Sequence, residues 1–170
     1  MKSLYVFLVL AVAGLLVTGA GSPTPPDSSN FVAVLSGAEE VPARETLARG
    51  TATFHVSADD SEVAYRLIVA NIENAFAAHI HCGPQGANGP VGVTLYTGQA
   101  GSGRADGVLA EGTFTGPNPG NACGWADLGQ VLDAMRSGNT YVNVHTNDGV
   151  APPDSGAGDF PGGEIRGQVQ

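Results

Sequence analysis

From Phe31 onward the sequence consists of short apolar segments separated by Gly, Pro, Asn and Asp. Residues 51–57 show the pattern most clearly, because Ala52, Phe54 and Val56 alternate with polar residues. A period of two is typical of a strand with one buried face. The candidate strands are 31–36, 51–57, 62–70, 75–82, 91–96, 108–115, 141–146 and 164–169. About eight strands at this spacing predict an all-β sandwich or barrel.

One helix is expected over residues 128–136. Asp127 can cap its first turn, and Gly138 with Asn139 can end it. The apolar residues of this segment fall on one stripe of a helix: Leu128, Val131, Leu132 and Met135. We expect this stripe to cover one end of the sandwich.

The first twenty residues have the pattern of a secretory signal peptide. Lys2 precedes an apolar run over 4–17, and small residues follow at 18–20. The alternative, an uncleaved anchor, is disfavoured because the run is shorter than the ~20 residues of a membrane span. Residues 21–30 are rich in Pro and Ser, so we expect a disordered linker before a domain over 31–170. The sequence therefore predicts a secreted or extracytoplasmic protein, in the periplasm or at the cell surface, with no membrane span after cleavage.

The charge and the motifs exclude several function classes. The formal net charge of −9 excludes nucleic acid as a partner, because nucleic-acid binders carry a basic surface. The sequence contains no G-x-S-x-G, no H-E-x-x-H and no phosphate-binding loop. We therefore expect a binding or structural module for an extracellular protein or a metal rather than an enzyme.

Cys82 and Cys123 are the only cysteines. In an exported chain such a pair favours a disulfide. The alternative is that the two thiolates bind a metal beside the histidines.

Three of the four histidines lie on compatible strand faces. His79 and His81 point to the same side of one predicted strand because side chains alternate. In the segment 141–146 the two valines take the core face, so His145 points outward. Three imidazoles that converge suit copper or zinc, and the long segment 147–162 could fold over them. In the alternative, His79 and His81 bond backbone in the turn 83–90 and His145 orders the long segment.

Two further polar features have a functional and a structural interpretation. Glu164 and Arg166 alternate on the last strand. They are either an acid ligand and an anion clamp beside the histidines, or a surface ion pair of about 0–1 kcal/mol. We expect His55 to lie on a solvated face, away from the other histidines.

Three stretches resemble the CHRD domain, which is named after repeats in chordin and also occurs singly in exported microbial proteins. They are LSGAEEVP from Leu35, AHIHCGP from Ala78 running on to NGPV, and YVNVHT from Tyr141 with the closing GEIRGQ. The resemblance covers residues 31–170. It implies an extracellular domain with an immunoglobulin-like, Greek-key β-sandwich that is distantly similar to copper/zinc superoxide dismutase.

In those dismutases a His-x-His strand and a later strand histidine bind copper, and His79, His81 and His145 resemble these ligands. The residues 82–139 contain no histidine that would bridge to a zinc ion. We therefore expect an extracellular binding or structural module whose ligands for copper or zinc are His79, His81 and His145, with Glu164 as a further candidate. The alternatives are a copper-dependent redox enzyme and a purely architectural surface protein.

Overall fold

The computed structural model describes residues 30–170. The predicted signal peptide and linker lie outside this range, except for Asn30, which is the first residue of β1. The strands are β1 (Asn30–Ser36), β2 (Arg49–Val56), β3 (Val63–Glu73), β4 (Ala75–Cys82), β5 (Val91–Thr97), β6 (Arg104–Phe114), β7 (Thr140–Thr146) and β8 (Ile165–Gln168). The single α-helix of the described residues is α1 (Leu128–Arg136). All eight predicted strands and the helix are confirmed, with β3 and β6 longer than expected.

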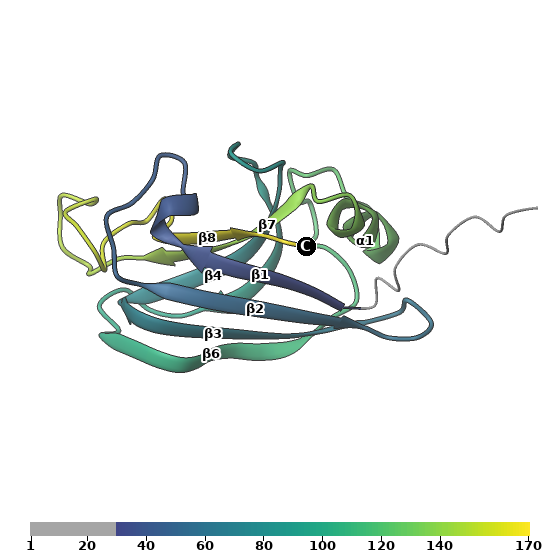
Figure 1. The fold of residues 1–170 in the computed structure, drawn as a ribbon, viewed down its shortest axis with the longest axis horizontal. Coiled ribbons are helices and arrows are strands. Elements are labelled where there is room, and N and C mark those ends of the chain that lie inside the picture. Colours follow the sequence, from purple (N-terminus) through teal and green to yellow (C-terminus); the bar gives the residue numbers. More distant parts are fainter. Residues whose placement is uncertain (1–29) are drawn as a thin grey trace, which may run out of the picture.

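The eight strands form one antiparallel sheet in the order β5-β4-β7-β8-β1-β2-β3-β6. Figure 1 shows that this sheet folds into two layers, with β1, β2, β3 and β6 in one and β4, β7 and β8 in the other. The layers join where Ser36 of β1 pairs with Arg166 of β8. On the other side, the Tyr65 hydroxyl of β3 donates to the Leu95 carbonyl of β5 over 2.7 Å. The predicted sandwich is therefore close to a barrel.

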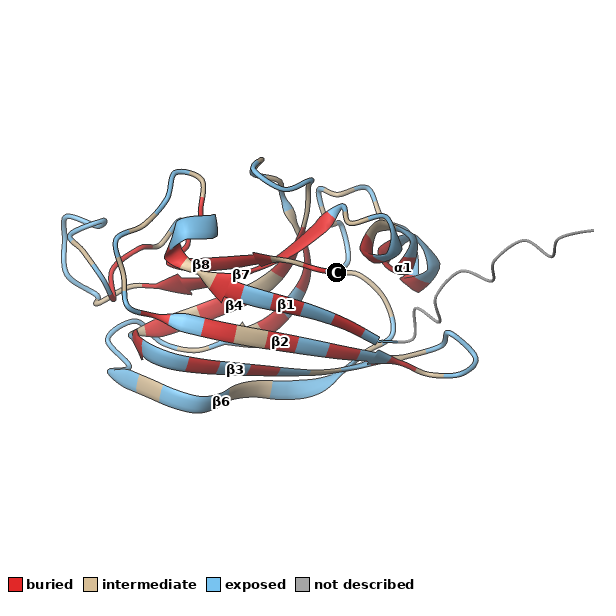
Figure 2. Cartoon of the chain, in the orientation of Figure 1, coloured by how far each residue is buried: buried red, intermediate tan, exposed pale blue. Residues whose placement is uncertain are grey.

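The core lies between the two layers and follows the expected alternation. Phe31, Ala33 and Leu35 of β1 are buried, whereas the residues between them are exposed, as the banding in Figure 2 shows. The apolar stripe of α1 joins the same core, and the helix lies at one end of the sheet, as expected (Figure 1). The Asp127 side chain caps the helix by accepting from the Gln130 amide.

Strand β7 departs from this alternation because all seven of its residues are buried. Its outward face is covered by three segments, which are residues 37–47, 83–90 and 156–163. Hydrogen bonds tie these segments to the sheet and to one another: Arg166 donates to Ala87, Asn88 donates to Val41, and the imidazole of His145 pairs with Pro161. We call the β4–β7–β8 part of the sheet the covered half, and the β1–β2–β3–β6 part the open half.

Cys82, at the end of β4, is disulfide-bonded to Cys123, as the sequence predicted. The Cα atoms are 5.8 Å apart, a usual separation for a disulfide. The alternative of two metal-binding thiolates is therefore wrong. The bond ties the strand that carries two of the histidines to the segment before α1.

Within residues 30–170, no helix has both the length and the apolar character needed to cross a membrane.

Candidate metal centre

The three predicted histidines meet on the outward face of the covered half. His79 and His81 lie on β4 and His145 lies on the neighbouring β7, where Asn143 pairs with His79 and Ala77 pairs with His145. All three imidazoles therefore point to the same side, away from the core. One ring nitrogen from each lies within 4.8 Å of the others. The sequence placed these residues correctly on one face.

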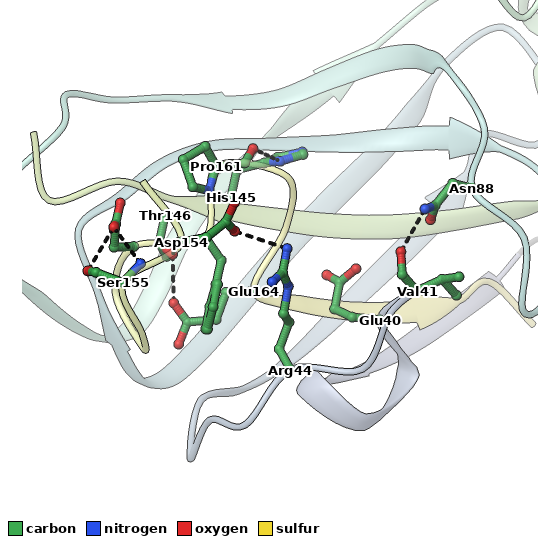
Figure 3. A network of polar contacts seen from close by, with 12 residues as sticks. Glu40, Val41, Arg44, Asn88, His145, Thr146, Asp154, Ser155, Pro161 and Glu164 are labelled. Atoms are coloured by element: carbon green, nitrogen blue, oxygen red, sulfur yellow. Dashed lines mark hydrogen bonds and ion pairs between the residues drawn. The ribbon is translucent and has the colours of Figure 1, made fainter. Parts of the chain in front are cut away.

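Two of the imidazoles are oriented by backbone carbonyls of the covering segments. The Nδ1 atom of His81 lies 2.9 Å from the Gly89 carbonyl oxygen, and Nδ1 of His145 lies 2.9 Å from the Pro161 carbonyl oxygen (Figure 3 shows the second bond). A carbonyl only accepts, so each Nδ1 carries the proton and each Nε2 keeps its lone pair. This is the arrangement in which a second hydrogen bond fixes the tautomer of a metal-binding histidine.

The remaining nitrogens face one another. Nδ1 of His79 lies 3.1 Å from Nε2 of His145, and the two rings meet edge to face with centroids 5.0 Å apart. Nε2 of His81 is buried and has no hydrogen-bond partner among the described residues. The cluster thus contains a buried lone pair that nothing in residues 30–170 uses.

Burial keeps these imidazoles neutral. His81 and His145 are 7% and 8% exposed, and His79 is half-buried. Burial, with the neighbouring imidazoles, lowers the pKa of His79 to about 4. Burial lowers the pKa of His81 to about 4 as well, and it also lowers the pKa of His145. At neutral pH the cluster therefore offers uncharged nitrogen donors.

The alternative in which the histidines only bond nearby backbone predicted three contacts, and the structure contains two of them. His81 bonds the turn 83–90, and His145 bonds the long segment through Pro161, as that alternative expected. His79 instead contacts His145. The long segment contacts the cluster near its end, at Pro161, and residues 83–90 contact it through Gly89.

Glu164 and Arg166 do not form the expected surface ion pair. Both are 1% exposed, and each bonds elsewhere. The Glu164 carboxylate accepts from the Thr146 hydroxyl at 2.7 Å (Figure 3). It also accepts from the Thr46 hydroxyl at 2.5 Å and from the Gly158 amide. Glu164 does not belong to the group of residues whose ligand atoms lie within 4.8 Å of one another, which consists of the three histidines. Alternation gave the correct face for both side chains, but the covering segments bury that face.

His55 lies outside the cluster, as expected. It is exposed on β2, and its Nδ1 atom is 2.7 Å from the Asn30 side-chain oxygen.

Sequence reasoning missed a buried polar pair beside the cluster. Glu40 is 7% exposed and accepts from the amide nitrogen of Asn143, while Glu40 Oε1 and Asn143 Oδ1 have no partner among the described residues. Gly163 makes room for this pair, because a Cβ there would lie 2.7 Å from Glu40 Oε1. Burial raises the pKa of Glu40 to about 7, against the opposing effects of Arg166 and Arg44. The only signal in the sequence was the position of Asn143 on the same face as His145.

Comparison with known proteins gives one match. The family model of the CHRD domain matches residues 31–153. No curated protein and no solved structure matches the chain. The matched range contains all three histidines, both cysteines and seven of the eight strands. Because this match spans most of the sequence, the chain belongs to the CHRD domain family.

Proposed function

We propose that this protein is an extracellular CHRD module that binds one copper or zinc ion through His79, His81 and His145. The observation that carries the proposal is the convergence of three neutral imidazoles, two of which are held by loop carbonyls through Nδ1, so that Nε2 keeps its lone pair. The unpartnered Nε2 of His81 supports it, since a buried polar atom without a partner costs free energy.

The chemistry of the donor set favours copper or zinc over a hard cation. The cluster offers nitrogen donors alone, and imidazole suits zinc and copper, whereas calcium and magnesium require oxygen ligands. The half-exposed His79 leaves one side of the cluster open to solvent. Three protein ligands with one open position are typical of sites at which a bound ion also contacts water or another small molecule.

The spacing of the nitrogens is close to what one ion needs. Two nitrogens at 2.0–2.1 Å from a tetrahedral ion lie about 3.3 Å apart. His79 Nδ1 and His145 Nε2, at 3.1 Å, already have this spacing. All three ligand nitrogens lie within 4.8 Å of one another, so the rings need to close by about 1.5 Å at most.

Metal titration of residues 21–170, purified without a histidine tag, tests the proposal. We expect the wild type to bind one zinc or copper ion and the His79→Ala/His145→Ala variant to bind none. His55→Ala is the matched control, because it removes a histidine of the open half and should leave binding unchanged. Zinc at 100 times its dissociation constant should stabilise the wild type by about 2.7 kcal/mol. Equal binding by the wild type and the double variant would overturn the proposal.

The architectural function is the second candidate, and the bonds from His81 and His145 to loop carbonyls favour it. In that case His145→Ala lowers the melting temperature by the same amount with and without added metal. If the histidines bind metal, the difference between wild type and variant grows when metal is added. Copper would supply one-electron redox chemistry, so superoxide and peroxide assays on copper-loaded protein test the third alternative.

Export and processing complete the proposal. Residues 1–20 act as a signal peptide, residues 21–30 as a linker and residues 31–170 as the domain, which is supported by the disulfide, since disulfides persist in oxidising compartments. The N-terminal residue of protein recovered from the extracytoplasmic fraction tests this. Retention of Met1 there would contradict cleavage.

A further inference from the structure

Arg166 is a buried cation that binds a loop instead of an acidic side chain. It is 1% exposed and donates to the carbonyl oxygens of Pro84 and Ala87, at 3.2 and 2.8 Å, and to Asn88 Oδ1 at 3.2 Å. All three acceptors belong to the segment 83–90. A buried charge is costly unless its donors are satisfied, so Arg166 is stable only while this segment lies on the sheet.

Tyr141 connects Arg166 to His81. The guanidinium carbon of Arg166 lies 3.4 Å from the centre of the Tyr141 ring. The His81 imidazole is also stacked on this ring, with the two ring centroids 4.8 Å apart and an angle of 13° between the ring planes. The three planar groups come from adjacent strands, β8, β7 and β4. A cation over a ring and a stacked ring pair each restrict rotation of the groups involved. The orientation of His81 is therefore coupled to the position of Arg166.

Tyr141 and Arg166 also fix the position of the Gly89 carbonyl, which orients His81. The Tyr141 hydroxyl accepts from the Gly89 amide at 3.0 Å and donates to the Gly89 carbonyl at 3.1 Å. Gly89 packs so closely on β4 that a Cβ there would overlap the Cys82 carbonyl oxygen. Arg166 holds the residues just before Gly89, and Asn88 is further tied to Val41 over 2.7 Å.

We infer that Arg166 and Tyr141 are positioning residues of the metal centre: they hold the Gly89 carbonyl against Nδ1 of His81 and so present Nε2 of His81 to the ion. The inference rests on the proposed function. Arg166 and Tyr141 act on the bond between His81 and Gly89 alone, because His145 is held by Pro161 in a different segment. Loss of Arg166 should therefore disturb His81 and leave His145 in place.

Two measurements on the same variants test the inference. The first is the tautomer of each histidine in metal-free protein, from nitrogen-15 NMR of the imidazoles at neutral pH. The second is zinc affinity by competition with a chelator. The variants are Arg166→Lys, which loses the planar fork and the stacking, and Tyr141→Phe, which keeps the ring and loses the hydroxyl. Arg66→Lys, at an exposed position of β3, is the matched control.

We expect His81 to lose its single Nδ1–H tautomer in both variants, while His145 keeps its own. The zinc dissociation constant should rise about 10- to 100-fold, the usual effect of removing a group that orients a metal ligand. Leu132→Ala, a core change in α1, controls for lost stability, because it should lower the melting temperature without altering the His81 tautomer.

The outcomes separate this inference from the function on which it rests. If wild type binds zinc and both variants keep the His81 tautomer and the affinity, Arg166 and Tyr141 are only structural and the inference is overturned. If Arg166→Lys does not fold, Tyr141→Phe decides alone. If wild type binds neither zinc nor copper, the proposed function fails and the positioning role fails with it.

Discussion

The two halves of the sheet differ in the exposure of their outward faces: the outward face of the open half meets solvent, whereas that of the covered half is buried. On the open half the outward side chains include Val34 and Ile68, which are 68% and 42% exposed. On the covered half the outward side chains include Asn143 and Arg166, which are 3% and 1% exposed. Apolar side chains are thus exposed on one face, beside polar ones such as Arg66, whereas polar side chains are buried on the other. The covering segments, and not the strands, account for this reversal.

The two faces differ because polar groups on the open half are solvated by water, whereas those on the covered half depend on hydrogen bonds within the protein. Arg66 and Glu111 on the open half form an exposed ion pair at 3.7 Å, of a kind that contributes little because water solvates both charges. On the covered half a polar group without a partner costs about 1–3 kcal/mol. The buried Glu164 carboxylate is accordingly bonded to Thr46 and Gly158 of the covering segments. The carbonyls that set the tautomers of His81 and His145 belong to these covering segments.

Removal of the disulfide should have the largest effect and should fall mainly on one half. Cys82 and Cys123 close a loop with a sequence separation of 41, so the Cys82→Ser/Cys123→Ser variant should lose about 3–4 kcal/mol of unfolding free energy. Denaturant unfolding measures the loss. Hydrogen exchange should show the largest loss of protection in residues 83–90, next to Cys82, and a smaller loss in β2 and β3. A uniform loss of protection would show that the two halves unfold as one unit.

Equivalent arginine substitutions should separate the halves next. Arg166→Met removes a buried side chain and leaves three part-buried loop bonds without their donor, so we expect a loss of about 2–4 kcal/mol. Arg66→Met removes an exposed side chain and should change stability by less than about 0.5 kcal/mol. Thermal and denaturant unfolding of both variants provide the comparison. Similar losses in the two variants would contradict the distinction between the halves.

The smallest effect is a pH dependence specific to Glu40. Because burial raises the pKa of folded Glu40 to about 7 from its ordinary 4.5, the folded protein keeps a proton that the unfolded chain has released between these values. The contribution of Glu40 to stability is therefore lost as pH rises from about 4.5 to about 7 and stays absent above. Glu40→Gln should remove this loss, which is about 3 kcal/mol at most.

The test is the difference between the unfolding free energies of wild type and Glu40→Gln across pH 4–8. Taking the difference cancels the contribution of the histidines to the pH dependence of stability. Because their pKa values are lowered, that contribution makes stability rise with pH below pH 6.5, opposite to the effect of Glu40. Glu111→Gln on the open half should give a flat difference over the same range. A flat difference for Glu40→Gln would mean that the buried carboxyl is ionised at little cost.

The strands, the helix and the faces of the key residues could be predicted from the sequence, because each depends on local periodicity. Alternation put the three histidines on the side opposite Ile80 and the core valines, and the two cysteines allowed only one pairing within the chain. Membership of the CHRD family was also recognisable from three short motifs.

The burial of that face was decided only by the tertiary structure. Whether Glu164 and Arg166 meet water or loop atoms depends on residues up to 118 positions away in sequence, such as Thr46. The contact between His79 and His145, the carbonyls of Gly89 and Pro161, and the raised pKa of Glu40 arise in the same way. A strand fixes the direction of a side chain by its own repeat, but its surroundings are supplied by segments whose positions no local pattern encodes.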